Sequence, residues 1–207
     1  MGNCSCPGNQ IHDWLFNEVL AMLPKKGIII VCFSLFLVYM GIMMIYTMLP
    51  LYVNSLKGSE YEIGLAMGSG GMGYFVGVLL FGWLSDLVKR RVVFIILGHL
   101  GLTIIAVGIT LSETPVQVMA VHFGGSIIAS ASYPSIMAYT ADMTAREVRG
   151  RWMGVVLASF FLPMALGAFL TGYALKGGYN MVCYLAAVMG IFSGVLVALL
   201  VKEEKNY

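Results

Sequence analysis

The ten residues Gly82-Trp83-Leu84-Ser85-Asp86-Leu87-Val88-Lys89-Arg90-Arg91 join two long apolar runs of the chain. They bring one acid and three basic residues together, whereas the two runs contain no Asp, Glu, Lys or Arg. Burying a charge in lipid is costly, so charges between apolar runs are typical of loops at a membrane surface. Of the 207 residues, 59% are hydrophobic and 11% are charged, whereas soluble domains carry about 25% charged residues. The sequence therefore predicts an all-α membrane protein.

Six apolar runs are long enough to cross a bilayer as helices, for which about 20 residues are needed. They are Gly27–Pro50, Ile63–Leu84, Val92–Leu111, Val116–Ala138, Trp152–Leu175 and Met181–Val201. None of these runs contains a charged residue. We expect residues 27–201 to form one transmembrane domain of six helices.

The basic residues predict the orientation of this domain, because loops rich in Lys and Arg stay in the cytoplasm. Of the 12 basic residues, 10 lie either before the first span or after the second, fourth or sixth span, which places them all on one side. Lys57 and Lys176 lie on the other side. Both termini are therefore expected in the cytoplasm, with the chain in the cell membrane. Residues 1–26 would form a cytoplasmic leader, whose helical spacing of apolar residues also suits an interfacial amphipathic helix. Residues 202–207 would form a cytoplasmic tail.

Patterns of catalysis and cofactor binding do not occur in the sequence. It lacks G-x-x-x-x-G-K-[ST], H-E-x-x-H and G-x-S-x-G, and its four cysteines do not have the spacing of a zinc site. A net charge of +2 is too small to suggest nucleic-acid binding. We expect a protein that is not an enzyme, with no cofactor, metal or nucleic-acid partner.

The charged stretch resembles the loop between helices two and three of major facilitator superfamily transporters, whose pattern is G-x-L-[AS]-D-[RK]-x-G-[RK]-[RK]. The matching residues are Gly82, Leu84, Ser85, Asp86, Arg90 and Arg91. Leu87 stands where the family has a basic residue, and Lys89 where it has a glycine. Four further segments are similar to family segments in the same order: Leu49–Tyr52, Ile63–Leu65, Ala141–Asp142 and Arg149–Arg151. The resemblance implies the N-terminal six-helix half of that fold, itself a 3+3 inverted repeat.

The resemblance also implies a cytoplasmic gate, because charge pairs at this loop hold the cytoplasmic side of family members closed. The candidate gate residues are Gly82, Asp86, Arg90, Arg91, Asp142, Arg149 and Arg151. We expect Asp86 to pair with a cation such as Arg90, Arg149 or Arg151, and Gly82 to let helices two and three approach. The alternative is that these charges only anchor the topology.

Polar side chains at helical spacing mark a candidate substrate path on the first and fourth spans. Steps of three or four residues place them on one face of each helix. The candidate residues are Tyr39, Tyr46, His122, Ser126, Ser130 and Tyr133. In the family, helices one and four contribute to the central cavity. The alternative is that these residues only form hydrogen bonds with neighbouring helices.

Two histidines and four glycines within the spans carry further expectations. His122 stands near the point where many exporters of the family carry an arginine linked to proton coupling, so a coupling proton is possible. His99 is expected to be a packing residue with satisfied hydrogen bonds. The pairs Gly64/Gly68 and Gly73/Gly77 predict tight helix crossing along the second span.

The leading hypothesis is a secondary transporter, or half of one, that moves a small organic solute by alternating access. Family members have about twelve spans, with the substrate between two halves, so a second six-helix half is expected as a separate chain or in a homodimer. The end at Lys202–Lys205 corresponds to the start of the family's central loop. This favours a split or truncated protein. The alternative is a non-transporting membrane protein, a truncated or regulatory half that binds a partner through its helices.

Overall fold

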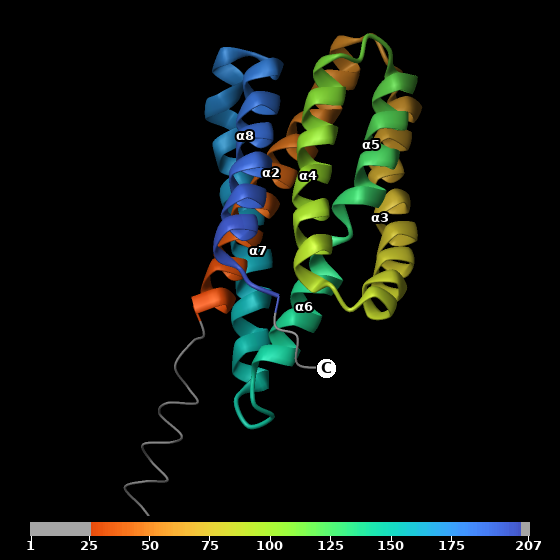
Figure 1. Ribbon diagram of the computed structural model, residues 1–207. Coiled ribbons are helices and arrows are strands. Elements are labelled where there is room, and N and C mark those ends of the chain that lie inside the picture. Colours follow the sequence, from red (N-terminus) through yellow and green to blue (C-terminus); the bar gives the residue numbers. More distant parts are fainter. Residues whose placement is uncertain (1–25, 204–207) are drawn as a thin grey trace, which may run out of the picture.

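The computed structural model describes residues 26–203, which are mostly helical (Figure 1). The helices are α2 (Lys26–Ser55), α3 (Glu60–Val88), α4 (Arg91–Thr110), α5 (Pro115–Ala129), α6 (Ser132–Met143), α7 (Arg149–Ala174) and α8 (Tyr179–Leu200), with a 3-10 turn at Leu175–Gly177. Five of them, α2, α3, α4, α7 and α8, are long and apolar enough to cross a membrane. The predicted leader helix lies almost entirely outside the described residues, as do residues 204–207 of the predicted tail.

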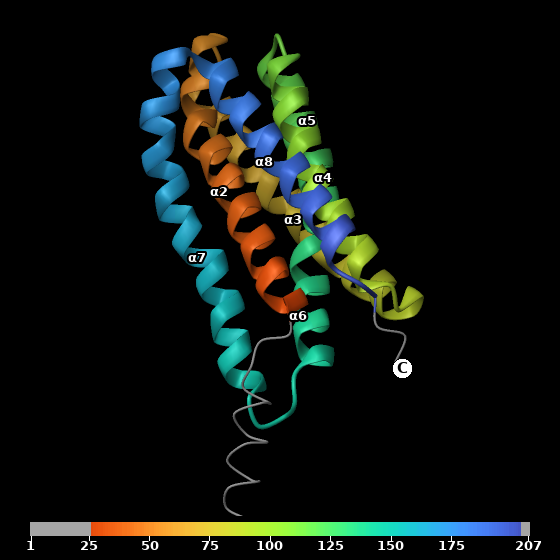
Figure 2. The same ribbon diagram turned by 60° about the vertical axis from the view of Figure 1, so that its left-hand side comes forward.

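The fourth predicted span, Val116–Ala138, is two helices rather than one. α5 ends at Ala129 and α6 begins at Ser132, and the two follow one another along the bundle (Figure 2). Pro134 explains the break, because a proline offers no N–H to the carbonyl group four residues earlier and its ring clashes with that group. That carbonyl belongs to Ser130, which lies in the break. At this point the Ala131 N–H donates to the Ile128 carbonyl at 3.1 Å, a tighter turn than the α-helix has.

Polar residues start α3 and α5, two of the helices that begin at the end of the bundle opposite the charged loops. Ser59 accepts a hydrogen bond from the Glu62 N–H, and the Glu62 carboxylate accepts one from the Ser59 N–H. Thr114 and Gln117 form the same reciprocal pair before α5. Such capping boxes satisfy N–H groups that a helix start leaves without partners, so both helices begin where their sequences predict a boundary.

The helices pack mainly across the two halves of the sequence. α2 lies against α7, α3 against α5, and α4 against α8 (Figures 1 and 2). Each pair joins one of the first three spans to one of the last three. If α2, α3 and α4 are exchanged with α5–α6, α7 and α8, the same set of pairs results. This packing has the symmetry of the predicted 3+3 inverted repeat.

Glycines allow the close contact of α3 with α5. A Cβ atom added at Gly73 or Gly77 would collide with the backbone of α5, including the Phe123 carbonyl. A Cβ added at Gly64 or Gly68 would meet no atom within 4 Å among the described residues. The prediction of tight crossing is therefore confirmed for Gly73 and Gly77. It is wrong for Gly64 and Gly68, which face away from the other helices.

The loops that carry most basic residues meet at one end of the bundle, which we call the basic end. The α3–α4 loop, the α6–α7 loop and the start of α2 all lie there, at the bottom of Figures 1 and 2. Apolar side chains such as Phe75, Trp83 and Phe169 are exposed along the sides of the bundle. An apolar lateral surface with charges at its end is the pattern that a bilayer requires.

Candidate functional site

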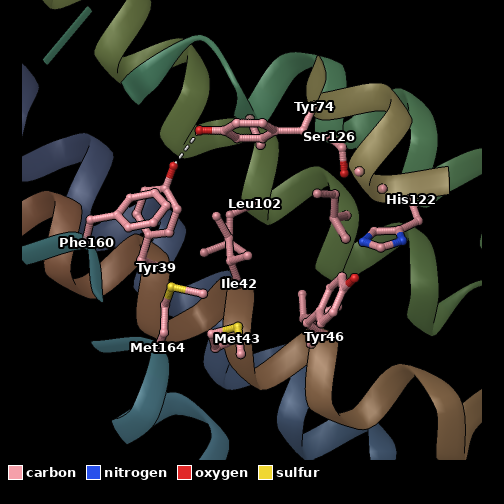
Figure 3. Close-up of a pocket in the computed structure, with 15 residues that line it drawn as sticks. Tyr39, Ile42, Met43, Tyr46, Tyr74, Leu102, His122, Ser126, Phe160 and Met164 are labelled. Carbon is pink, nitrogen blue, oxygen red and sulfur yellow. Dashed lines mark hydrogen bonds between the residues drawn. The ribbon is translucent and has the colours of Figure 1, made fainter. Parts of the chain in front are cut away.

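A pocket of about 400 Å³ lies in the middle of the bundle, and we call it the bundle pocket. It is lined by residues of α2, α3, α4, α5 and α7 (Figure 3). The lining residues are Tyr39, Ile42, Met43, Ile45, Tyr46, Gly70, Gly71, Tyr74, Leu102, Ile105, His122, Ser126, Ala129, Phe160 and Met164. No Asp, Glu, Lys or Arg is among the described residues that line it.

Aromatic side chains form the end of the pocket nearer the basic end. The hydroxyl groups of Tyr39 and Tyr74 lie 2.7 Å apart and share a hydrogen bond between α2 and α3. The ring of Phe160 on α7 lies 4.2 Å from that of Tyr39, centroid to centroid. Figure 3 shows these three side chains grouped on one side of the pocket. The group closes this end of the pocket with ring surface.

Polar side chains form the opposite end of the pocket. The Nδ1 atom of His122 lies 2.9 Å from the Ala66 carbonyl oxygen, so Nδ1 donates a hydrogen bond and fixes the ring against α3. The ring of Tyr46 lies 6.2 Å from the imidazole, centroid to centroid, and Ser126 stands beside them in Figure 3. In the neutral imidazole, Nε2 is then an acceptor. This end therefore offers hydroxyl groups and one imidazole nitrogen to a ligand.

Gly70 makes room for the imidazole. A Cβ atom at this position would collide with the His122 ring. Sequence reasoning assigned the glycines of α3 to helix packing and missed this role. The only sequence signal was the unusual number of glycines in the span, which does not single out Gly70.

Four of the six predicted path residues line the pocket: Tyr39, Tyr46, His122 and Ser126. Ser130 and Tyr133 do not. The Ser130 hydroxyl donates to the Ile127 carbonyl at 2.6 Å, and the Tyr133 ring packs on Phe160 at 5.1 Å. The break before α6 explains the difference, because it interrupts the helical spacing from which the stripe was predicted.

Three pocket residues that the sequence did not single out come from α3 and α7. They are Tyr74, Phe160 and Met164. The predicted path consisted of polar residues on the first and fourth spans, whereas these side chains lie on other helices among apolar or glycine-rich neighbours. Of the three, only Tyr74 carries a polar group, and a polar residue within a span was the one sequence signal that could have indicated a pocket residue.

Arg91 is the centre of a charged cluster at the basic end. Its guanidinium group lies 2.6 Å from the Asp86 carboxylate and 3.6 Å from that of Asp142, and it donates to the Ser85 hydroxyl at 2.9 Å. Ser135 of α6 donates in turn to Ser85 at 3.3 Å. We call these five residues the Arg91 cluster. It connects the end of α3 and the start of α4 to both ends of α6.

The cluster contains only part of the predicted gate set. The ion pair of Asp86 is with Arg91, not with the expected Arg90, Arg149 or Arg151. Arg90 is exposed at the start of α4, and Arg149 donates to the Thr144 carbonyl at 3.4 Å. Arg151 is exposed near the start of α7.

Gly82 does not have the predicted packing role. A Cβ atom at Gly82 would meet nothing within 4 Å in the described part of the chain. The expected approach of helices two and three at this residue is therefore wrong. The two helices are joined by their loop and by the Arg91 contacts instead.

His99 lies outside the pocket, fully buried where α4 faces α8. Its Nδ1 hydrogen-bonds to the Ile95 carbonyl at 2.6 Å. Its Nε2 is buried without a hydrogen-bond partner among residues 26–203. The prediction of a packing residue is confirmed, but the ring is satisfied at only one nitrogen.

Comparison with known protein families identifies the family to which this arrangement of helices belongs. The family described as the Major Facilitator Superfamily matches residues 31–207. The chain belongs to the major facilitator superfamily. It is a multi-pass membrane protein of a superfamily whose transporters carry small-molecule solutes across membranes.

Two curated relatives show how much of a superfamily protein is present. The quinolone resistance protein NorA of Staphylococcus aureus (strain MRSA252) is 22% identical over 185 residues, which are 88% of this chain and 47% of NorA. An uncharacterised transporter of the superfamily from Methanocaldococcus jannaschii is 22% identical over 173 residues, 83% of this chain and 45% of that protein. The chain thus spans about half the length of the curated relatives it matches.

Proposed function

We propose that this chain forms the N-terminal half of a secondary transporter that moves a small organic solute by alternating access. The observation that carries the proposal is the bundle pocket, which lies midway between the ends of the bundle and is lined from five helices. Superfamily substrates bind at this depth between two halves. A pocket of about 400 Å³ falls within the usual range of small-molecule sites, about 300–1,000 Å³.

In this proposal the basic end faces the cytoplasm of the cell membrane and the Arg91 cluster is part of the inner gate. Arg91 is only 12% exposed, and Asp86 and Asp142 approach it from the last turn of α3 and from the end of α6. A guanidinium group can hold two carboxylates because its donors point in fixed, separate directions. Separating α6 from the start of α4 would break the contact between Asp142 and Arg91. The cluster therefore favours the arrangement of the basic end in which α6 lies against Arg91.

The proposal includes a second six-helix half, as a separate chain or a second copy of this one. The length of the matched relatives supports it, since this chain spans 47% of NorA. His122 is the candidate site for a coupling proton, because its imidazole lines the pocket and changes charge near neutral pH in its ordinary state. The transporter would use no cofactor and perform no catalysis.

Flux through proteoliposomes tests the function. The purified chain, alone and together with a candidate second half, is reconstituted and supplied with a panel of organic solutes, with and without a pH gradient. We expect flux that saturates with solute and falls several-fold in Asp86→Asn. Arg90→Gln, a neighbouring exposed charge, is the control and should retain flux.

A non-transporting protein that binds a partner through its helices is the second candidate. Apolar side chains exposed along the bundle, such as those of Phe75 and Phe169, would offer such a partner a surface. No flux with either the chain alone or the paired halves, combined with stable co-purification of another membrane protein, would support this reading over transport.

A further inference from the structure

The two ends of the bundle pocket leave different polar atoms for a ligand. At the aromatic end, the hydroxyl groups of Tyr39 and Tyr74 are engaged with each other at 2.7 Å. At the polar end, the hydroxyls of Tyr46 and Ser126 and the Nε2 atom of His122 have no hydrogen-bond partner within residues 26–203. A ligand therefore finds mostly ring surface at one end and unpaired polar atoms at the other.

Charge is missing from both ends. Within the described residues, none that lines the pocket is acidic or basic apart from His122. An ion that leaves water for an apolar site without a counter-charge loses much more free energy than a neutral group does. The pocket of this chain therefore disfavours both organic anions and organic cations.

The spacing along α2 sets the reach of a ligand that touches both ends. Tyr39 and Tyr46 both line the pocket, and seven residues of helix between them correspond to about 10 Å. Two fused aromatic rings with one polar substituent are of this size. The rings can lie on Phe160 and Tyr39 while the substituent reaches His122.

We infer that the bundle pocket binds an uncharged aromatic compound that carries a hydrogen-bond donor, with its rings at the Tyr39–Phe160 end and its donor on His122 Nε2. This inference rests on the proposed function and names the solute class. It makes His122 a specificity-determining residue, because the neutral imidazole accepts a hydrogen bond from the solute.

A matched series of naphthalene probes tests the solute class on the unmodified chain in lipid nanodiscs at pH 8, where an imidazole of ordinary pKa is neutral. The probes are 2-naphthol, 2-methoxynaphthalene, 2-naphthoate and 2-naphthyltrimethylammonium, and binding to empty nanodiscs is subtracted. We expect saturable binding of 2-naphthol. The methoxy compound, which has no donor, should bind about tenfold more weakly, as expected when one hydrogen bond is lost. Both ions should bind more weakly still.

Single-residue variants test the contribution of each end of the bundle pocket separately. His122→Leu should weaken 2-naphthol about tenfold and leave the methoxy compound unchanged, whereas Phe160→Ala should weaken both to the same degree. Phe169→Ala, on the exposed side of the same helix, is the control and should change neither. The comparison of probes on the unmodified chain does not depend on the folding of any variant.

Two results would overturn the inference while leaving a solute pocket in place: equal binding of 2-naphthol and its methoxy analogue, or tighter binding of the ammonium compound. Absence of saturable binding for all four probes would overturn it as well. In each of these cases, flux of a solute outside this class in proteoliposomes would keep the proposed function. Absence of flux for every solute would remove both the inference and the proposed function.

Discussion

Arg91 has a different burial from the charges around it. Its side chain is 12% exposed, whereas those of its partners Asp86 and Asp142 are 70% and 42% exposed. A pair with one exposed partner is screened by water and worth little. The nearly buried guanidinium group also donates to Ser85, so its removal leaves more groups without partners than removal of either acid does.

Arg91→Ala is expected to destabilise the protein by about 1–3 kcal/mol, and Asp86→Asn by less than about 1 kcal/mol. Thermal unfolding in detergent, followed by circular dichroism, measures both. Arg90→Ala is the matched control, because Arg90 is exposed and adjacent. A loss of stability in Arg90→Ala as large as that in Arg91→Ala would show that net charge, not the contacts of Arg91, is responsible.

Gly70→Ala is expected to displace the His122 ring, because the added methyl group would occupy its position. The hydrogen bond to Ala66 is then lost, and we expect destabilisation of about 1–3 kcal/mol together with weaker binding of 2-naphthol. Gly68→Ala is the control on the same helix, since its methyl group would meet open space. Equal melting temperatures for the two variants would contradict the assigned role of Gly70.

At the scale of elements, the break between α5 and α6 is the main departure from the predicted helices. The composition of the runs predicted six spans, with ends about one to five residues from those of the helices, because lipid excludes charge from the interior of a span. The break was missed because one proline in an apolar run hardly changes its hydropathy. The pocket walls from α3 and α7 were missed for a related reason: Phe160 and Met164 look the same in sequence whether they face lipid or a cavity.

Pro134→Ala is expected to join α5 and α6 into one helix, because it restores an N–H for the Ser130 carbonyl and removes the ring that clashes with it. Spin labels at Val116 and Ala141, in a background without other cysteines, measure the separation of the two ends. We expect a different and narrower distance distribution than in the chain with Pro134. An unchanged distribution would mean that α4, whose Gly98 and Gly101 pack against Ser132 and Ala129 at the break, maintains it rather than the proline.

At the scale of the whole molecule, the packing of each early span against a late one holds the bundle together. The principal pairs are α2 with α7, α3 with α5 and α4 with α8. The main contacts of the first three spans are with the last three spans, not with one another. The two sets are therefore expected to be stable only together.

Cutting the chain in the connection between α4 and α5, at residues 111–114, tests this interdependence. Two pieces expressed together are expected to co-purify and to regain the melting behaviour of the intact chain. Each piece expressed alone should fail to accumulate. A cut in the middle of α4 is the control, and it should prevent assembly. Accumulation of either piece alone as a folded unit would contradict the interlocked packing.

The same packing imposes an order on biogenesis. A ribosome delivers α2, α3 and α4 to the membrane before any of their principal partners exist, so the glycine face of α3 and the buried imidazole on α4 meet lipid or the insertion machinery first. Among the described helices, α4 gains its main partner only when α8, the last of them, has been synthesised. Quality control of these helices during insertion would therefore act only after α8 has emerged. A nascent chain that stops before α8 would be recognised as unfinished by the polar surface of α4 that remains uncovered.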